Sequence, residues 1–75
     1  LERVERIAVE VATEVLGRVQ GGVKDFLPSV RFQAFAEWGI KFAVSLKARQ
    51  FTDNYLLKHE FIKALAKRFK EEGIE

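Results

Sequence analysis

The sequence predicts a small α+β domain, in the order helix, strand, strand, helix, whose β-hairpin packs on two helices. Apolar residues recur at helical spacing over residues 1–19 and again over 53–72. Between these segments they alternate with polar residues in two short runs, which a break containing Gly39 separates. With 75 residues, 48% of them hydrophobic and 32% charged, the chain has the size and composition of one globular domain, residues 1–75.

The composition excludes several classes of site. The absence of cysteine excludes a disulfide scaffold, a zinc knuckle and a thiol nucleophile. No run approaches the roughly 20 apolar residues of a membrane-spanning helix, and no signal peptide is apparent. Thirteen Lys and Arg against eleven Asp and Glu give a net charge of +2, too even a balance to indicate a nucleic-acid binder. Because the chain begins with Leu1 rather than Met, we expect an excised piece of a longer protein.

The first helix is expected over residues 1–19, followed by a loop over 20–28. Its apolar residues fall three or four positions apart and form one stripe: Leu1, Val4, Ile7, Ala8, Val11, Val15 and Val19. Two ion pairs of favourable orientation are expected on its outer surface, Glu2–Arg6 and Glu14–Arg18. Gly21 and Gly22 then end the helix.

Two strands are expected, over residues 29–37 and 40–50. Alternate apolar residues give each strand one apolar face: Val30, Phe32, Ala34 and Ala36 in the first, and Ile40, Phe42, Val44, Leu46 and Ala48 in the second. Both faces must lie on the same side, because a one-residue slip would turn the second set out to water. We expect both helices to cover this face. A two-stranded sheet leaves its outer edges unpaired, so we expect either that flanking strands are missing or that the hairpin pairs with another copy.

The second helix is expected over residues 53–72, with Thr52 or Asp53 as its cap. Four apolar residues recur at every fourth position on its inner face: Leu57, Phe61, Leu65 and Phe69. Gly73 stands where a left-handed residue ends a helix, and Ile74 follows it at the spacing of a Schellman motif, whose apolar contact is with Phe69.

No catalytic, cofactor-binding or metal-binding constellation is apparent. His59 is the single histidine and lacks other ligands at a suitable spacing, so we expect a surface position. Glu71 and Glu72 are neighbours at a helix end and point in different directions, unlike a hydrolytic carboxylate pair. The two serines have no base near them in the sequence. We therefore expect no enzyme and no cofactor.

The remaining candidates are interface residues. The outer face of the predicted hairpin is basic, and a tryptophan stands at its turn; together these positions are Arg31, Phe35, Trp38, Lys41, Lys47 and Arg49. Phe35 and Trp38 are of the type that anchors protein interfaces. A basic sheet with an aromatic side chain could also stack single-stranded RNA, but one phenylalanine is less than the usual platform.

The hairpin reads Val30-Arg31-Phe32-Gln33-Ala34-Phe35 and then Gly39-Ile40-Lys41-Phe42-Ala43-Val44-Ser45-Leu46. The second helix carries Glu60-Phe61, Ala64-Leu65 and Phe69, and ends in Gly73-Ile74-Glu75. Together these stretches resemble the C-terminal cytoplasmic α/β domain of the small-conductance mechanosensitive channel family, and residues 1–20 resemble the helix that precedes them. The turn departs from the family's usual Asp-Ser-Ser, since it reads Glu37-Trp38-Gly39 here. His59 also departs from the family, because it stands where arginine is frequent.

The resemblance implies a ferredoxin-like domain on the cytoplasmic side of the cell membrane. In the family, a strand precedes the first helix and an Ile-Pro-Phe-Pro strand follows the second, so both would be missing from this chain. Family subunits assemble as homo-oligomers, heptamers, whose cytoplasmic domains form a cage that ions and small solutes cross. The implied role is structural, without a cofactor or nucleic acid, and with membrane contact only through segments absent from this chain.

Two other functions are compatible with the same elements. A small ferredoxin-like regulatory domain, similar to an ACT module, would bind its ligand at a strand–helix junction, for which residues 20–29 are the candidate loop. An RNA-binding sheet would use the outer face of the hairpin and would lose affinity steeply with salt.

Overall fold

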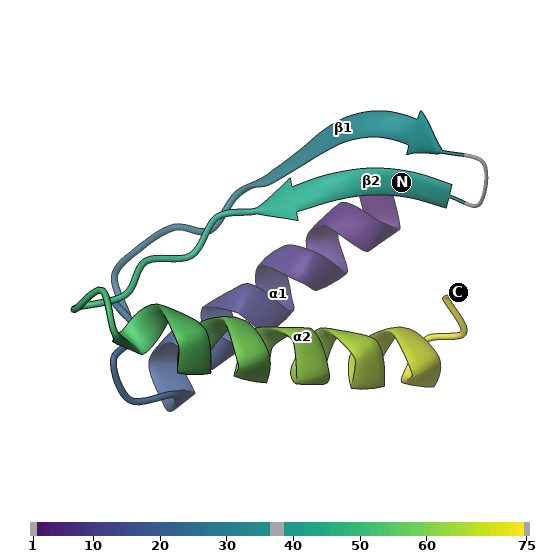
Figure 1. Ribbon diagram of the computed structural model, residues 1–75. Helices are drawn as coiled ribbons and strands as arrows, with labels where there is room; N and C mark the ends of the chain where they lie inside the picture. Colours follow the sequence, from purple (N-terminus) through teal and green to yellow (C-terminus); the bar gives the residue numbers. More distant parts are fainter. Residues whose placement is uncertain (1, 37–38, 75) are drawn as a thin grey trace.

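The computed structural model describes residues 2–36 and 39–74. Its elements are α1 (Glu2–Arg18), β1 (Val30–Ala36), β2 (Gly39–Val44) and α2 (Asp53–Glu71). The two antiparallel strands form a hairpin that lies over the helices, with α1 next to the strands (Figure 1). The expected fold class, a β-hairpin packed on helices, is therefore confirmed. Residues 1, 37, 38 and 75 lie outside the described part of the chain.

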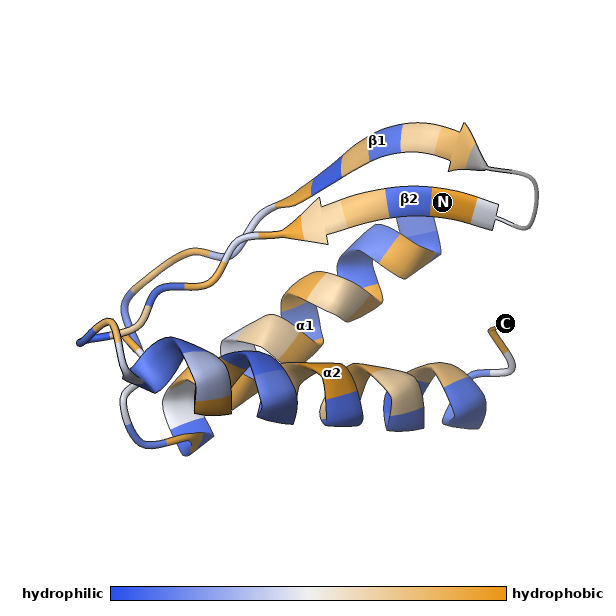
Figure 2. Cartoon of the chain, viewed as in Figure 1, coloured by the Kyte–Doolittle hydropathy of each residue, from blue (hydrophilic) through white to orange (hydrophobic). Residues whose placement is uncertain are grey.

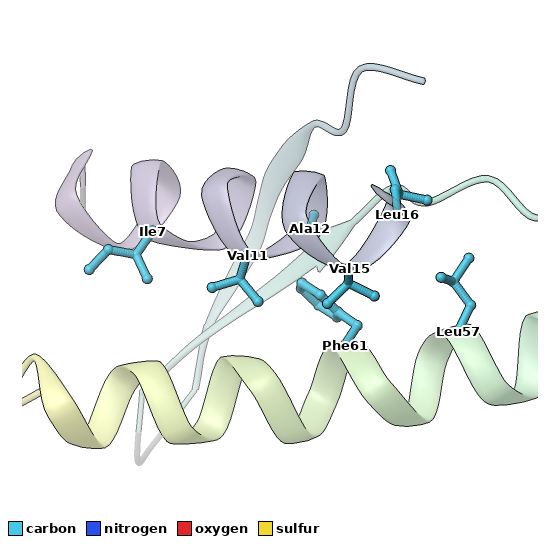
Figure 3. Close-up of a cluster of buried hydrophobic side chains, with 7 residues drawn as sticks. All are labelled: Ile7, Val11, Ala12, Val15, Leu16, Leu57 and Phe61. Carbon is cyan, nitrogen blue, oxygen red and sulfur yellow. The ribbon is translucent and has the colours of Figure 1, made fainter. Parts of the chain in front are cut away.

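Helix α1 occupies the centre of the domain. Its buried face is wider than the predicted stripe, since Ala12 and Leu16 are buried along with Ile7, Ala8, Val11 and Val15. The two strands and α2 all contact this helix, so a second row of its side chains is enclosed. From α2, Leu57 and Phe61 complete the buried cluster (Figure 3). Polar residues cover much of the outer surface of both helices (Figure 2), although Leu56 and Ile62 of α2 are also exposed.

A loop held by backbone hydrogen bonds follows α1. Gly21 adopts a φ of +94°, and a Cβ atom at this position would lie 2.5 Å from Cγ of Asp53. The loop then pairs with the segment after β2: the N–H of Val23 donates to the carbonyl of Lys47, and the N–H of Arg49 donates to that of Gly21. Glycine is thus required at position 21 by both its backbone conformation and its surroundings.

The second strand is shorter than the sequence predicts. We expected residues 40–50, whereas β2 ends at Val44. Ser45 still donates its N–H to the carbonyl of Ser29, but the next inward carbonyl, that of Lys47, accepts the N–H of Val23 from the loop after α1 instead of bonding to the segment before β1. From there the segment pairs with the loop after α1, including an isolated bridge between Gly22 and Ala48.

A β-bulge changes the register of the hairpin. Phe32 lies opposite Phe42, with ring centroids 5.9 Å apart. The next pairs are Ala34 with Lys41 and Phe35 with Ile40, so the regular pairing skips Gln33. The extra residue turns Phe35 onto the same face as Phe32, since directly opposed residues share a face. The expectation that Ala34 would continue the apolar face and that Phe35 would lie outside is wrong.

The apolar face of the hairpin is only partly covered. Phe32 remains 39% exposed and Phe35 85% exposed. Among the described residues, no Cα atom of α2 lies within 8 Å of a Cα atom of either strand, so α2 packs on α1 and reaches the hairpin only through side chains. The expectation that both helices would fully cover this face is therefore too strong.

The ends of α2 differ in how closely they follow the predictions. Thr52 precedes the helix but has helical backbone angles and makes no capping hydrogen bond with its side chain. The carboxylate of Asp53 instead accepts the backbone N–H of Gln50 at 3.2 Å. At the other end, Gly73 has a φ of +73°, and the N–H of Ile74 donates to the carbonyl of Phe69 at 2.8 Å. The predicted Schellman ending is confirmed, with Ile74 packed against the core.

Candidate functional site

The predicted interface residues do not form one surface. Arg31 and Lys41 lie on the outer face of the hairpin, because they are paired with Ala43 and Ala34 respectively. Phe35, paired with Ile40, lies on the inner face. The bulge therefore separates the aromatic side chain from the basic residues with which we expected it to act. Trp38 lies outside the described residues.

Lys47 and Arg49 lie beyond the end of β2. Both side chains are exposed, while their backbones bond to the loop after α1, through the carbonyl of Lys47 and the N–H of Arg49. They therefore flank the hairpin at its base rather than extending the outer face of the sheet.

An apolar groove lies between β2 and α2. It has a volume of about 460 Å³ and is lined by Phe42, Val44, Leu46, Asn54, Leu57, Lys58, Phe61, Ile62 and Leu65. Lys58 is the charged residue of this lining. Ile62, on the rim, is 54% exposed. We name this feature the β2–α2 groove. Its lining is mainly apolar, and no pattern in the sequence predicted it.

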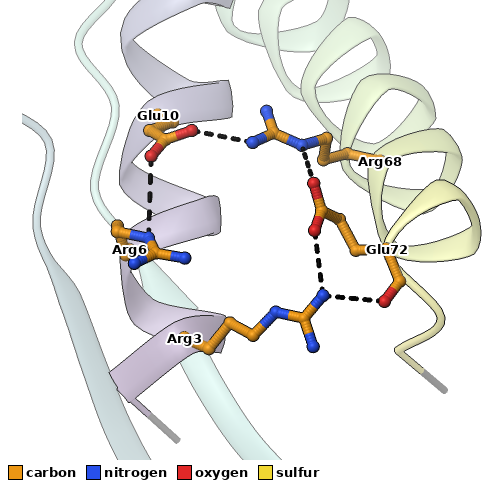
Figure 4. Close-up of polar contacts among 5 residues, drawn as sticks. All are labelled: Arg3, Arg6, Glu10, Arg68 and Glu72. Atoms are coloured by element: carbon orange, nitrogen blue, oxygen red, sulfur yellow. Dashed lines mark hydrogen bonds and ion pairs between the residues drawn. The ribbon is translucent and has the colours of Figure 1, made fainter.

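A row of ion pairs connects α1 and α2 (Figure 4). Nη2 of Arg68 lies 2.8 Å from Oε1 of Glu10, and Nε of Arg68 lies 3.1 Å from Oε2 of Glu72. Nη2 of Arg3 lies 2.9 Å from Oε1 of Glu72 and also donates to the backbone carbonyl of Glu72. We call these four residues, Arg3, Glu10, Arg68 and Glu72, the helix clasp.

The contacts of the helix clasp shift the pKa values of two of its members, Glu72 and Arg68. Hydrogen bonds from Arg3 and then from Arg68 lower the pKa of Glu72 below its ordinary value. The hydrogen bond to Glu10, followed by that to Glu72, raises the pKa of Arg68. The sequence indicated only that Glu72 is one of two neighbouring carboxylates at a helix end, because no local spacing places the start of α1 beside the end of α2.

Of the two local ion pairs expected on α1, one is confirmed. Nε of Arg18 lies 3.9 Å from Oε1 of Glu14. Arg6 pairs with Glu10 at 3.8 Å rather than with Glu2. The carboxylate of Glu10 therefore has two cationic neighbours, Arg6 on its own helix and Arg68 on α2.

A polar cleft of about 510 Å³ lies at the base of the hairpin. It is formed by the end of α1, the loop after it and the start of α2: Gly17, Arg18, Val19, Gln20, Gly21, Gly22, Lys24, Arg49, Gln50 and Asp53. This cleft includes part of the loop that a ligand-binding module would use. Its lining holds three cationic residues, Arg18, Lys24 and Arg49, and Asp53, whose carboxylate accepts the N–H of Gln50.

His59 is exposed on α2, as the sequence predicts. Within residues 2–36 and 39–74, no three His, Asp or Glu side chains lie close enough together to hold a metal ion. Neither described helix has the length and apolar character needed to cross a lipid bilayer.

Comparison with protein-family models, curated proteins and solved structures gives no match to this chain. The geometry therefore carries the functional argument alone. The described residues present an apolar groove beside the outer edge of β2, a basic outer face of the hairpin, the polar cleft at its base and a cleft with a mainly charged lining between α1 and α2. Surfaces of these kinds can bind a ligand or another protein chain.

Proposed function

We propose that this chain is a structural and assembly domain, the cytoplasmic domain of a channel subunit related to the small-conductance mechanosensitive family. The observation that carries the proposal is the β2–α2 groove beside the free edge of β2. A hairpin of this kind reaches full burial of its apolar face only when further strands or another subunit join it. A domain that lines the vestibule of an oligomeric channel is built from such incomplete units.

The hairpin register favours this reading over an RNA-binding sheet. Single-stranded RNA is bound where aromatic rings and basic side chains share one face of a sheet. Here Phe35 lies on the inner face, opposite Ile40, while Arg31 and Lys41 lie on the outer face. The basic residues thus lack a stacking partner among the described residues of their own face.

The outer face has a role of its own in the proposed vestibule. Arg31 and Lys41 are exposed and positively charged, and Lys47 and Arg49 follow at the base of the hairpin. When such charges line a confined passage, their field raises the local concentration of anions. We therefore assign these four residues to the solvent-filled side of the assembly and the β2–α2 groove to the side that is covered.

The proposal is tested by exchanging domains. Residues 1–75 replace the corresponding segment of a small-conductance mechanosensitive channel, with the neighbouring segments of that channel retained. We expect the chimera to assemble in the membrane and to open under suction in a patch recording. A matched chimera with Leu57→Ala, which removes a buried side chain, is expected to lose assembly. Failure of the first chimera to assemble, while its isolated chain folds, would overturn the proposal.

The charges of the outer face are tested in the same chimera. Reversal of Arg31 and Lys41 to glutamate is expected to shift the preference for anions over cations toward cations. Reversal of Lys63 and Lys67, two exposed residues of α2, serves as the control of equal charge. An unchanged ion preference after the first reversal would refute the vestibule role of these residues.

A second candidate is supported by the polar cleft at the base of the hairpin. Its lining includes residues 20–22, Lys24 and Asp53, where a ferredoxin-like regulatory module would hold a small polar ligand. A thermal-shift screen with amino acids and nucleotides tests it, because a ligand that binds only the folded chain raises the melting temperature by mass action. A shift that Asp53→Ala abolishes would favour this function over the structural one.

A further inference from the structure

The chain exposes more surface than a compact monomer of its mass. Its accessible surface is 5771 Å², whereas a monomeric protein of 8.6 kDa exposes about 4,700 Å². Its radius of gyration is 12.4 Å, against about 11 Å for a compact domain of 75 residues. The excess of roughly 1,100 Å² is comparable with the about 800 Å² that each partner buries in a stable interface. The excess is therefore of the size that one standard interface covers.

Backbone bonding along β2 shows which groups are left unpaired. Ser45 donates its N–H to the carbonyl of Ser29, so the pair formed by these residues faces inward. Because bonding alternates along an antiparallel ladder, Ala43 also faces β1. Ile40, Phe42 and Val44 then direct their N–H and C=O groups away from β1, toward the free edge. Their side chains point to the helix side of the sheet, where they are half-buried.

The two edges of the hairpin are not equally suited to pairing. The edge of β1 is interrupted by the bulge at Gln33, and bulges disrupt the regular row of donors and acceptors that an incoming strand needs. The edge of β2 is regular from Gly39 to Val44. Phe42 and Val44 also line the β2–α2 groove. A strand added here would bond to the edge and place alternate side chains over the groove.

We propose that two copies of this chain pair through their β2 edges, antiparallel about a twofold axis at Phe42, to form one four-stranded sheet. The second copy is the occupant that fits, because β2 is itself a strand with a free edge and with apolar side chains on the helix side. Each copy thus supplies the element that the other lacks, as an isologous interface requires.

The pairing also places uncovered surfaces beside each other. In this register Ile40 lies opposite Val44 of the second copy, and Lys41 lies opposite Ala43, so no like charges are directly opposed. Ile40 thus lies beside the β2–α2 groove of the second copy, which Val44 lines, and Phe35, which is 85% exposed, lies one strand further out. Ile62, which is 54% exposed, stands on the rim of each groove. This pairing is argued from the 75-residue chain alone. It is the alternative to the flanking strands of the channel proposal, which would take the same edge, so failure of the dimer leaves that proposal standing.

The experiment measures self-association of the whole 75-residue chain, made by chemical synthesis, with sedimentation velocity over a range of concentrations. One variant carries a methyl group on the backbone nitrogen of Phe42, which removes the donor at the proposed axis and keeps the side chain. The control carries the same group on Val30, whose nitrogen faces the outer edge of β1. We expect a dimer for the unmodified chain and the control. Methylation at Phe42 loses two hydrogen bonds and is expected to weaken dimerisation by about tenfold or more.

A second pair of variants tests the groove by its side chains. Ile62→Lys adds a charge on the rim of the β2–α2 groove, whereas Leu56→Lys adds the same charge at a position of α2 that is 49% exposed and does not line the groove. We expect only Ile62→Lys to dissociate the dimer, with both variants retaining the circular dichroism of the parent. A monomer at all concentrations would overturn the proposal. So would a dimer that is insensitive to methylation at Phe42 and to Ile62→Lys.

Discussion

The guanidinium of Arg68 on α2 lies 2.8 Å from the carboxylate of Glu10 on α1, although the two residues are far apart in the sequence. Through Glu72, which Arg68 and Arg3 both contact, the start of α1 is tied to the end of α2. Single exposed ion pairs stabilise little, but several charges that share acceptors form a network. The helix clasp therefore fixes the relative placement of the helices at the end farthest from the loops.

Acid is expected to weaken the clasp through Glu72. Because Arg3 and Arg68 lower the pKa of Glu72 from its ordinary value of 4.5, its stabilising effect is complete above that value. The effect is lost as the pH falls through the lowered pKa. Thermal unfolding at low salt, followed by circular dichroism over a series of acidic buffers, measures this loss. We expect the melting temperature of Glu72→Gln to fall less on acidification than that of the parent. Glu71→Gln is the control, and equal acid sensitivity of all three chains would contradict the role of the clasp.

Removal of one buried side chain of α2 is expected to unfold much of the population. Leu57 is only 2% exposed, and Leu→Ala substitutions in cores cost about 2–5 kcal/mol. A domain of this size has a free energy of unfolding of only about 3–5 kcal/mol. Urea unfolding of Leu57→Ala measures the loss. His59→Ala, at an exposed position of the same helix, is expected to change stability by less than about 0.5 kcal/mol. Similar midpoints for both variants would show that the core is not where the structure places it.

Alanine at two glycines separates backbone strain from crowding. Gly73 has a φ of +73° with nothing within 4 Å of an added Cβ, so Gly73→Ala is expected to cost only the left-handed conformation, about 1–2 kcal/mol. Gly21 has a similar φ, but its Cβ would clash with Asp53. Gly21→Ala is therefore expected to cost more, as measured by urea unfolding. Equal losses would mean that Asp53 moves aside freely.

The bulge predicts an unusual tolerance to deletion. Deletion of Gln33 removes the residue that the pairing skips, so Phe35 is expected to remain opposite Ile40. Cross-strand nuclear Overhauser contacts between these residues test the expectation. Deletion of Ala43, in the regular strand β2, shifts the register by one residue and is expected to abolish the hairpin. Loss of the Phe35–Ile40 contacts in the first variant would mean that the bulge is needed for folding.

Local patterns in the sequence predicted those features that depend on neighbouring residues. The apolar stripe of α1, the glycine after it and the Schellman ending at Gly73 and Ile74 are all of this kind. In each case the residue type determines the backbone conformation or the buried face within one or two helical turns. The fold class followed, because alternation and helical spacing are distinct periods.

Features that depend on the relative placement of elements were missed. Alternation in β1 has the same period with or without a bulge, so the sequence placed Phe35 on the outer face. The partnership of Glu72 with Arg3 requires the two helix ends to meet, which no local spacing indicates. The β2–α2 groove depends on how far α2 stands from the strands. Its one sequence signal was that apolar residues at Ile62 and Leu65 widen the apolar arc of α2 beyond what one contact with α1 requires.

The backbone bonds between the two connecting loops give the domain one fixed end and one open end. The amides of Val23 and Arg49 are held by carbonyls from the opposite loop, whereas Phe35, near the other end of the hairpin, is 85% exposed. The amide hydrogens of Val23 and Arg49 are therefore expected to exchange with deuterium more slowly than those of the hairpin near Phe35. A force that pulls the hairpin away from the helices would therefore separate the end near Phe35 first, while the hydrogen-bonded loops stay together and act as a hinge.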